Sequence, residues 1–294
     1  VIVGLSPEKV GKAKLYTNEK NDSFQFRTVD NINAYLVPGK NIFVDAMQKP
    51  IDERAQMRFG NHFYYAKDLI MSRAEANLLI DQDKSCLPFI KKFYGAKEVI
   101  SGVPRACIWV KDNEFFNAKK IDSLSKRFNK VAEARRGAKN DKAAHALAYK
   151  PYRFRDQFIA ESHLLAMPAI SSENRPYMPV DLLDKNCILG HKSYVLYDAP
   201  LWNFALIASR LHWVWISTVC GRLGMSFSYS NTLGWNTFPV PKLTTKNKLD
   251  MTKATEEILI AREQHYPKSI ADLYEPDSMP ADLVAAHNKN DEIL

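Results

Sequence analysis

The sequence predicts a mixed α/β fold, of the α+β kind, with a small helical segment at the C-terminus. Three observations support this prediction: short β-rich stretches separated by turns, a long apolar helical pattern from about Leu201, and two patterns with acidic faces after Pro241. A chain of 294 residues, 46% of them hydrophobic, can bury a sizeable core in one large or two modest domains.

Strand patterns dominate the first fifty residues, at VIVG (1–4), FQFRTV (24–29) and NIFVDA (41–46). Further along, Ser72 and Glu75 form a capping-box pattern that predicts a short helix. The alternation of PRACIWV (104–110) then predicts a half-buried strand.

Residues 115–142 combine a helical apolar stripe with the densest basic region of the chain. The predicted core-facing positions are Phe116, Ile121, Leu124, Phe128 and Val131. The predicted outer positions are Lys119, Lys120, Lys126, Arg127, Lys130, Arg135, Arg136, Lys139 and Lys142. These cations either lie along phosphates or form an ordinary solvated helix face, and the sequence leaves both readings open.

Strands are also predicted at HLLAMPAI (163–170), which ends in the polar run SSENRP (171–176), and at SYVLY (193–197). The apolar pattern at 201–219 contains Arg210, and a charge in the middle of a membrane span costs roughly 2.5 kcal/mol or more. We therefore predict one long helix buried in a soluble core rather than a membrane span.

The segment CGRLGMSFSYSNTLGWNTFPVP (220–241) follows directly on this helix. Its small polar and aromatic residues on a rigid support are typical of a recognition surface. The stretch KLTTKNK (242–248) is then predicted to be a linker, followed by helices at 249–265 and 281–288.

The net charge of +8 is unevenly distributed. Residues 250–294 carry ten acids and four bases, so the first 249 residues carry 37 bases and 23 acids. A basic body with an acidic tail is typical of a protein that meets a polyanion, although scattered lysines that only confer solubility give the same balance.

No catalytic or metal-binding pattern appears in the sequence. The four cysteines have no C-x-x-C spacing, and we expect reduced, mostly buried thiols. The seven histidines include no H-E-x-x-H pair, and His163 and His212, which lie in apolar runs, are expected to be core residues. No glycine-rich nucleotide loop is present, so this chain alone is expected to be non-catalytic.

Several blocks in a fixed order resemble the target-recognition region of MmeI-type (type IIG/IIL) restriction-modification enzymes. They are FIKKFYGAKEVI (89–100), RACIWV (105–110), ISSENRPYMPV (170–180), the stretch 201–241 and SIADLYEPDSMPADLVAAHN (269–288). These enzymes join an adenine-N6 DNA methyltransferase to a recognition domain, usually behind a nuclease. The resemblance runs nearly end to end and includes VIVGLS (1–6), which resembles the last strand of the methyltransferase domain.

The resemblance implies three parts: the end of a methyltransferase domain with a connector (1–48), a DNA target-recognition domain (49–241) and a C-terminal helical segment (242–294). It implies double-stranded DNA and the methyltransferase domain of the same parent chain as partners, in the prokaryotic cytoplasm and without a membrane. The methyltransferase motifs are not in these residues. We therefore expect no cofactor or metal here, and S-adenosylmethionine in a parent enzyme, which in this family is usually fused to an endonuclease as well.

The family's base-specifying positions carry over to two short loops of this chain. The residues expected to read bases are Glu173, Asn174, Arg175, Gly224, Met225, Ser226 and Ser228. Those expected to contact the DNA backbone or shape the loops are Arg222, Tyr229, Ser230, Asn231, Lys126, Arg127 and Lys130. The alternatives are a stand-alone nucleic-acid-binding protein and a protein-interaction scaffold whose aromatic loop docks a partner.

Overall fold

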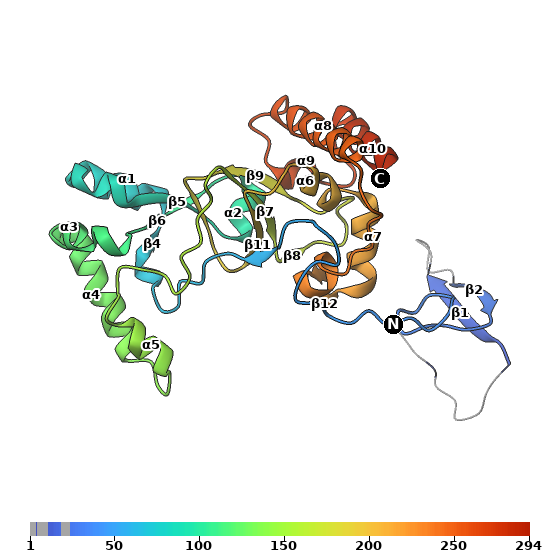
Figure 1. The fold of residues 1–294 in the computed structure, drawn as a ribbon, viewed down its shortest axis with the longest axis horizontal. Coiled ribbons are helices and arrows are strands. Elements are labelled where there is room, and N and C mark those ends of the chain that lie inside the picture. The colour runs from blue at the N-terminus through green and yellow to red at the C-terminus, as the bar shows by residue number, and fades with distance from the viewer. Residues whose placement is uncertain (1–3, 5–10, 19–23) are drawn as a thin grey trace. The chain divides into compact units, whose positions relative to one another are not determined.

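The computed structural model describes residues 4, 11–18 and 24–294, and the chain divides into two compact units, Val1–Ala46 and Met47–Leu294 (Figure 1). In the first unit, β1 (Ala13–Asn18) pairs antiparallel with β2 (Phe24–Val29), as predicted for 24–29. The strand predicted at 41–46 is wrong: the Val44 N–H donates to the Tyr35 hydroxyl at 2.7 Å instead of to a neighbouring strand. Most of the VIVG strand prediction lies outside the described residues.

Three sheets form the framework of the second unit, in the orders β10-β5-β6-β4, β3-β11-β7-β9 and β12-β13-β8. Their strands are β3 (Arg58–Phe59), β4 (Ile70–Met71), β5 (Ile90–Tyr94), β6 (Arg105–Ile108), β7 (His163–Pro168), β8 (Ile170–Ser171), β9 (Asp181–Asp184), β10 (Cys187–Leu189), β11 (Ser193–Tyr197), β12 (Gly221–Leu223) and β13 (Ser226–Ser228). The predicted strands at 104–110, 163–170 and 193–197 are confirmed as β6, β7 with β8, and β11.

Helices surround these sheets and make the unit a mixed α/β structure with a helical C-terminus, as predicted. The helices are α1 (Arg73–Gln82), α2 (Ala96–Ser101), α3 (Phe115–Lys119), α4 (Asp122–Arg136), α5 (Lys142–Leu147), α6 (Trp202–Ile207), α7 (Arg210–Val219), α8 (Thr245–Glu263), α9 (Ile270–Leu273) and α10 (Ala281–Ile293). The capping box predicted at Ser72 is present at the start of α1, where the Glu75 N–H donates to the Ser72 hydroxyl.

The basic region 115–142 differs from the single helix that we predicted. It forms α3 and α4, with α5 beginning only at Lys142, and packs against the sheet β10-β5-β6-β4 through Leu124, Phe128 and Val131. Two side chains were placed on the wrong face: Phe116 is 76% exposed, and Arg135 is fully buried. The Phe116 error comes from extending one helical period across the break between α3 and α4. Arg135 lies four residues after Val131 on the buried stripe of α4, and it was placed on the outer face because it is charged.

The apolar pattern at 201–219 forms two helices instead of one. Ser209 interrupts the pattern because its hydroxyl accepts the His212 N–H at 3.0 Å and caps α7, while it donates to the Leu206 carbonyl at 2.8 Å. In the described part of the chain, no helix is long and apolar enough to cross a membrane.

The C-terminal helices pack on α6 and are tied to the rest of the unit by buried polar groups. Arg262 donates to the Val180 carbonyl and to the Tyr274 hydroxyl, and Nε2 of His287 lies 2.7 Å from the same hydroxyl. The predicted linker 242–248 is only partly correct, because Thr244 forms a capping box that starts α8 at Thr245.

Candidate nucleic-acid interface

The structure brings the two loops expected to read bases into one small sheet. Strand β13 pairs antiparallel with β8, with Phe227 opposite Ser171 and Ser228 opposite Ile170, and β12 pairs with the other edge of β13. The polar run 171–176 therefore leaves the sheet beside the β12–β13 hairpin. Residues about fifty positions apart in the chain thus become neighbours through backbone hydrogen bonds.

The hairpin has a buried side and an exposed side. Gly224 adopts a φ of +61° in the turn, a left-handed conformation that glycine reaches without strain. Phe227 is only 4% exposed and packs edge-on against a tryptophan of α7, which stabilises the hairpin by roughly 1.5–3 kcal/mol. Because side chains alternate along a strand, Ser226 and Ser228 lie on the other face, where both are half-buried.

An ion pair links the two loops directly. The Arg222 guanidinium contacts the Glu173 carboxylate, donates to the Met225 carbonyl at 3.1 Å and lies 4.3 Å from the centre of the Phe227 ring. Met225 itself is 70% exposed at the hairpin turn. Glu173 and Arg222 therefore neutralise each other in an ion pair that holds the two loops side by side.

Arg175 and Asn174 are less constrained. Arg175 is half-buried, and its Nη1 donates only a long hydrogen bond of 3.4 Å to the Ser171 hydroxyl. Its Nε is buried without a partner among the described residues, and burial lowers the pKa of the guanidinium while leaving it cationic. Asn174 is exposed. The exposed Asn174 side chain therefore has a donor and an acceptor available to a ligand, whereas Arg175 can offer only the exposed part of its guanidinium.

Three residues at the base of the hairpin support the loops. Tyr229 is 4% exposed, its hydroxyl lies 3.1 Å from Nε2 of His212, and burial raises its pKa well above the ordinary value. Asn231 donates to the Met57 carbonyl at 3.0 Å, and the Ser230 hydroxyl pairs with the threonine hydroxyl two residues on. These contacts fit the loop-shaping alternative, and His212 is the core histidine expected from the sequence.

The predicted backbone contacts on α4 occupy different environments. Lys130 is exposed. Lys126 is exposed as well and pairs with Asp122 at 2.7 Å, one helical turn away. Arg127 donates to the Asp68 carbonyl at 2.8 Å, and this hydrogen bond also holds α4 against the segment that contains Asp68. Of these three cations, Lys130 is free of an ion pair among the described residues, and Lys126 shares its charge with Asp122.

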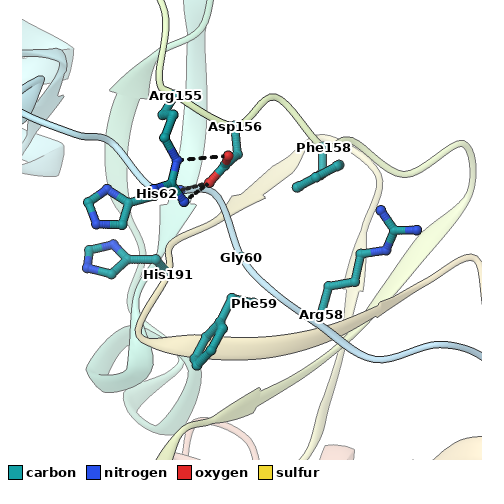
Figure 2. Close-up of a pocket in the computed structure, with 8 residues that line it drawn as sticks. All are labelled: Arg58, Phe59, Gly60, His62, Arg155, Asp156, Phe158 and His191. Atoms are coloured by element: carbon teal, nitrogen blue, oxygen red, sulfur yellow. Dashed lines mark hydrogen bonds and ion pairs between the residues drawn. The ribbon is translucent and has the colours of Figure 1, made fainter. Parts of the chain in front are cut away.

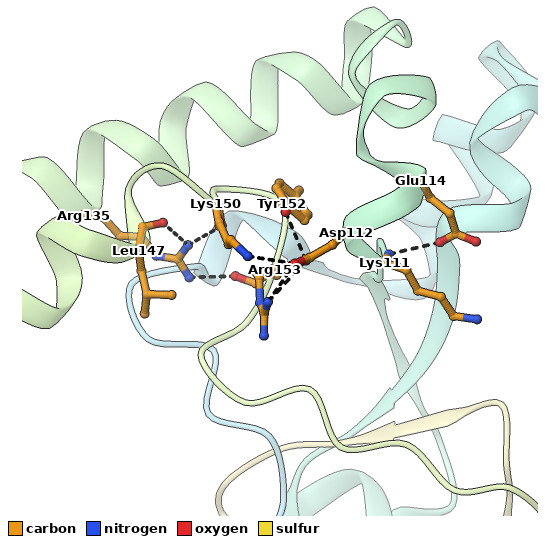
Figure 3. A network of polar contacts seen from close by, with 8 residues as sticks. All are labelled: Lys111, Asp112, Glu114, Arg135, Leu147, Lys150, Tyr152 and Arg153. Atoms are coloured by element: carbon orange, nitrogen blue, oxygen red, sulfur yellow. Dashed lines mark hydrogen bonds and ion pairs between the residues drawn. The ribbon is translucent and has the colours of Figure 1, made fainter.

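Arg135 has a structural role in the lobe formed by α4, α5 and the segment 147–153 (Figure 3). Its guanidinium donates to the carbonyls of Phe63, Tyr64, Leu147, Lys150 and Arg153. Beside it, Asp112 accepts hydrogen bonds from Lys150, Tyr152 and Arg153 (Figure 3). The phosphate reading is therefore wrong for Arg135.

Sequence reasoning missed a cavity of about 420 Å³ beside β3 (Figure 2). Its lining residues are Arg58, Phe59, Gly60, His62, Arg155, Asp156, Phe158 and His191. No sequence motif marks it, because three segments far apart in the chain contribute to it. Among the described residues, no cluster of histidine, cysteine and carboxylate side chains is placed to hold a metal ion.

Comparisons with known proteins agree with this architecture. The chain is 35% identical over its whole length to DNA methyltransferase A of Bacillus subtilis (strain 168), of which it spans 33%. Its fold matches a solved structure of the type IIL restriction-modification enzyme MmeI in complex with DNA, with a TM-score of 0.89, 28% identity, and coverage of 97% of this chain and 38% of that one.

Two family models cover most of the chain. The C-terminal domain of MmeI matches residues 243–294, and the target recognition domain of MmeI matches residues 38–242. The match to the target recognition domain includes both loops, the hairpin and the lobe of α4 and α5. The chain therefore belongs to the MmeI target recognition domain family.

Proposed function

We propose that this chain recognises a specific sequence in double-stranded DNA on behalf of an adenine-N6 DNA methyltransferase of the restriction-modification type. The observation that carries the proposal is the joining of the 171–176 run and the β12–β13 hairpin in one sheet. Two adjacent polar loops on a buried support present several donors and acceptors together, as base readout in the major groove requires. The structure of the relative MmeI was solved in complex with DNA.

Within this proposal, the two loops contact different bases and the lysines of α4 contact phosphates. Arg175 donates two parallel hydrogen bonds to a guanine, and Asn174 pairs with an adenine, each with about 1–3 kcal/mol of discrimination. Ser226 and Ser228 read bases directly or through water, with Gly224 and Met225 shaping the tip. Lys126 and Lys130 contact phosphates and set the orientation of the duplex.

The remainder of the proposal concerns the parent protein, since the chain spans only about a third of its relatives. We expect a methyltransferase domain of the same chain, to which residues 1–48 partly belong, acting in the prokaryotic cytoplasm. S-adenosylmethionine supplies the methyl group there. The 294 residues contribute register and sequence choice, and the target adenine is flipped out of the duplex by the other domain.

A binding selection from a randomised duplex pool tests the proposal. The wild-type chain should enrich one sequence, with affinity that falls steeply between about 50 and 200 mM salt. Arg175→Ala should relax the preference at one base pair and weaken binding to the preferred site by about 5- to 150-fold. Lys253→Ala, on the exposed side of α8, is the matched control and should change neither.

The outcomes separate the alternatives. A chain that binds duplex without any sequence preference would support a general nucleic-acid-binding protein. One that shows no salt-dependent binding at all would support a protein-interaction scaffold. An Arg175→Ala variant with unchanged preference would refute only the assignment of that residue.

A further inference from the structure

The cavity beside β3 lies along the connection between the reading loops and the basic lobe. On one side, the ring of Phe59 stacks on Tyr194 at 4.2 Å, and the Tyr194 hydroxyl donates to the Tyr229 carbonyl next to the hairpin. On the other side, Tyr64 donates to Asp141 at the start of α5, and its carbonyl accepts a hydrogen bond from Arg135 of α4. The segment 58–64 therefore bridges two surfaces already assigned to DNA.

The charge of the cavity is positive. The Arg155 guanidinium and the Asp156 carboxylate pair at 2.9 Å, so their charges offset each other. Arg58 lies 5.3 Å from the centre of the Phe158 ring and has no carboxylate within ion-pair distance in the described part of the chain. Its positive charge thus stays uncompensated at the mouth of the cavity, where Figure 2 shows it opposite the histidines.

The histidines line the cavity at the end away from Arg58 and add no charge to it (Figure 2). The rings of His62 and His191 stack at 4.1 Å. The Tyr64 N–H donates to Nδ1 of His62 at 3.0 Å, so the neutral ring keeps its proton on Nε2. Burial lowers the pKa of both histidines, which favours their neutral form. An uncompensated guanidinium beside an aromatic ring suits a phosphate together with the edge of its sugar.

We propose that this cavity binds a phosphodiester group of the duplex that the reading loops hold, and that Arg58 is the residue that contacts it. The inference rests on the proposed function and adds a contact between the loops and α4. With Lys126 and Lys130 farther along, the backbone is gripped at several points, which fixes the register needed for base readout.

Arg58→Ala tests the proposal, because the side chain is exposed and its loss leaves the core intact. With a duplex that carries the preferred site, affinity should fall about tenfold, the size expected for one charged hydrogen bond. The slope of log affinity against log salt should become less negative by about 0.9, one phosphate contact. The sequence preference should not change. Arg58→Lys should restore the slope, and Lys253→Ala should match wild type.

Each other outcome has a distinct meaning. A wild-type chain that does not bind duplex overturns the proposed function. A wild-type chain that binds specifically, with an Arg58→Ala variant of equal affinity and salt slope, overturns only the cavity. A changed preference at one base pair would make Arg58 a base reader instead. An effect seen with single strands but not with intact duplex would assign the cavity to an unstacked nucleotide and overturn the duplex assignment.

Discussion

Replacing Arg135 with alanine should destabilise the lobe of α4 and α5 rather than remove a DNA contact. The guanidinium is fully buried and donates to five backbone carbonyls at 2.8–3.4 Å. Burial lowers its pKa to about 10, so it is still cationic at pH 7. Removing the side chain leaves those carbonyls buried without their donors.

The expected loss follows from these contacts. A hydrogen bond from a charged donor contributes about 1.5–3 kcal/mol, but desolvation of the guanidinium offsets part of the sum. Breaking a buried charged network by removing one partner costs about 3–5 kcal/mol, and this is the decrease that we expect in the free energy of unfolding. Arg135→Lys should lose less, since an ammonium satisfies only some of the carbonyls.

Urea unfolding followed by tryptophan fluorescence measures this decrease. Lys130→Ala on the exposed face of the same helix is the control and should change stability by no more than about 0.5 kcal/mol while weakening DNA binding. If Arg135→Ala lost less than about 1 kcal/mol and still bound DNA poorly, the structural assignment of Arg135 would be refuted in favour of a phosphate contact.

Three further outcomes are expected. A double-mutant cycle on Glu173 and Arg222, measured by urea unfolding, should give a coupling of about 0.2–1 kcal/mol because the pair is partly exposed, and a coupling of zero would contradict the link between the loops. Burial holds the pKa of His212 and His287 at about 3, against about 6.5 in the unfolded chain. The free energy of unfolding should therefore fall as pH falls from 6.5 towards 3, and at pH 5.5 the loss should be about 1.4 kcal/mol for each histidine. His212→Gln should flatten this pH dependence, and an unchanged slope would argue against burial of the neutral ring. Gly60→Ala should lower the melting temperature and cost about 1–3 kcal/mol in the free energy of unfolding, because a Cβ there would lie 2.5 Å from the Gly190 carbonyl oxygen. A melting temperature equal to that of wild type would show that the backbone at Gly190 can move.

The sequence predicted most elements whose identity depends on local patterns. Strands β6, β7 and β11 alternate or run apolar, and α1 has its capping box, so neighbouring residues suffice to identify them. The wrong helix boundaries occur where a single capping residue ends or begins a helix. Ser209 splits the apolar helix by capping α7, and Thr244 begins α8 inside the predicted linker. Hydroxyl caps such as these compete with helix continuation, and hydrophobic periodicity does not register them.

The candidate site was predictable only in part. The resemblance identified both loops, but their contact depends on the pairing of β8 with β13, which no local pattern encodes. The pairing of Arg222 with Glu173 was not foreseen either, because Arg222 was expected to contact the DNA backbone or shape its own loop, and Glu173 was expected to read a base. Arg58 was overlooked because most of the residues that line the cavity with it lie in distant segments of the chain.

The sheet that carries the loops also determines how their specificity can change. The side chains of Ser226 and Ser228 alternate with the buried Phe227, so substitutions at the two serines alter the face that we propose reads DNA and leave Phe227 in the core. Inserting one residue before them would exchange the two faces, expose the phenylalanine and bury a serine. It would also displace Arg222 from Glu173, which lies in the other loop. If the hairpin reads bases as we propose, substitution is therefore the route to a new base preference, and a change in hairpin length would disturb both loops at once.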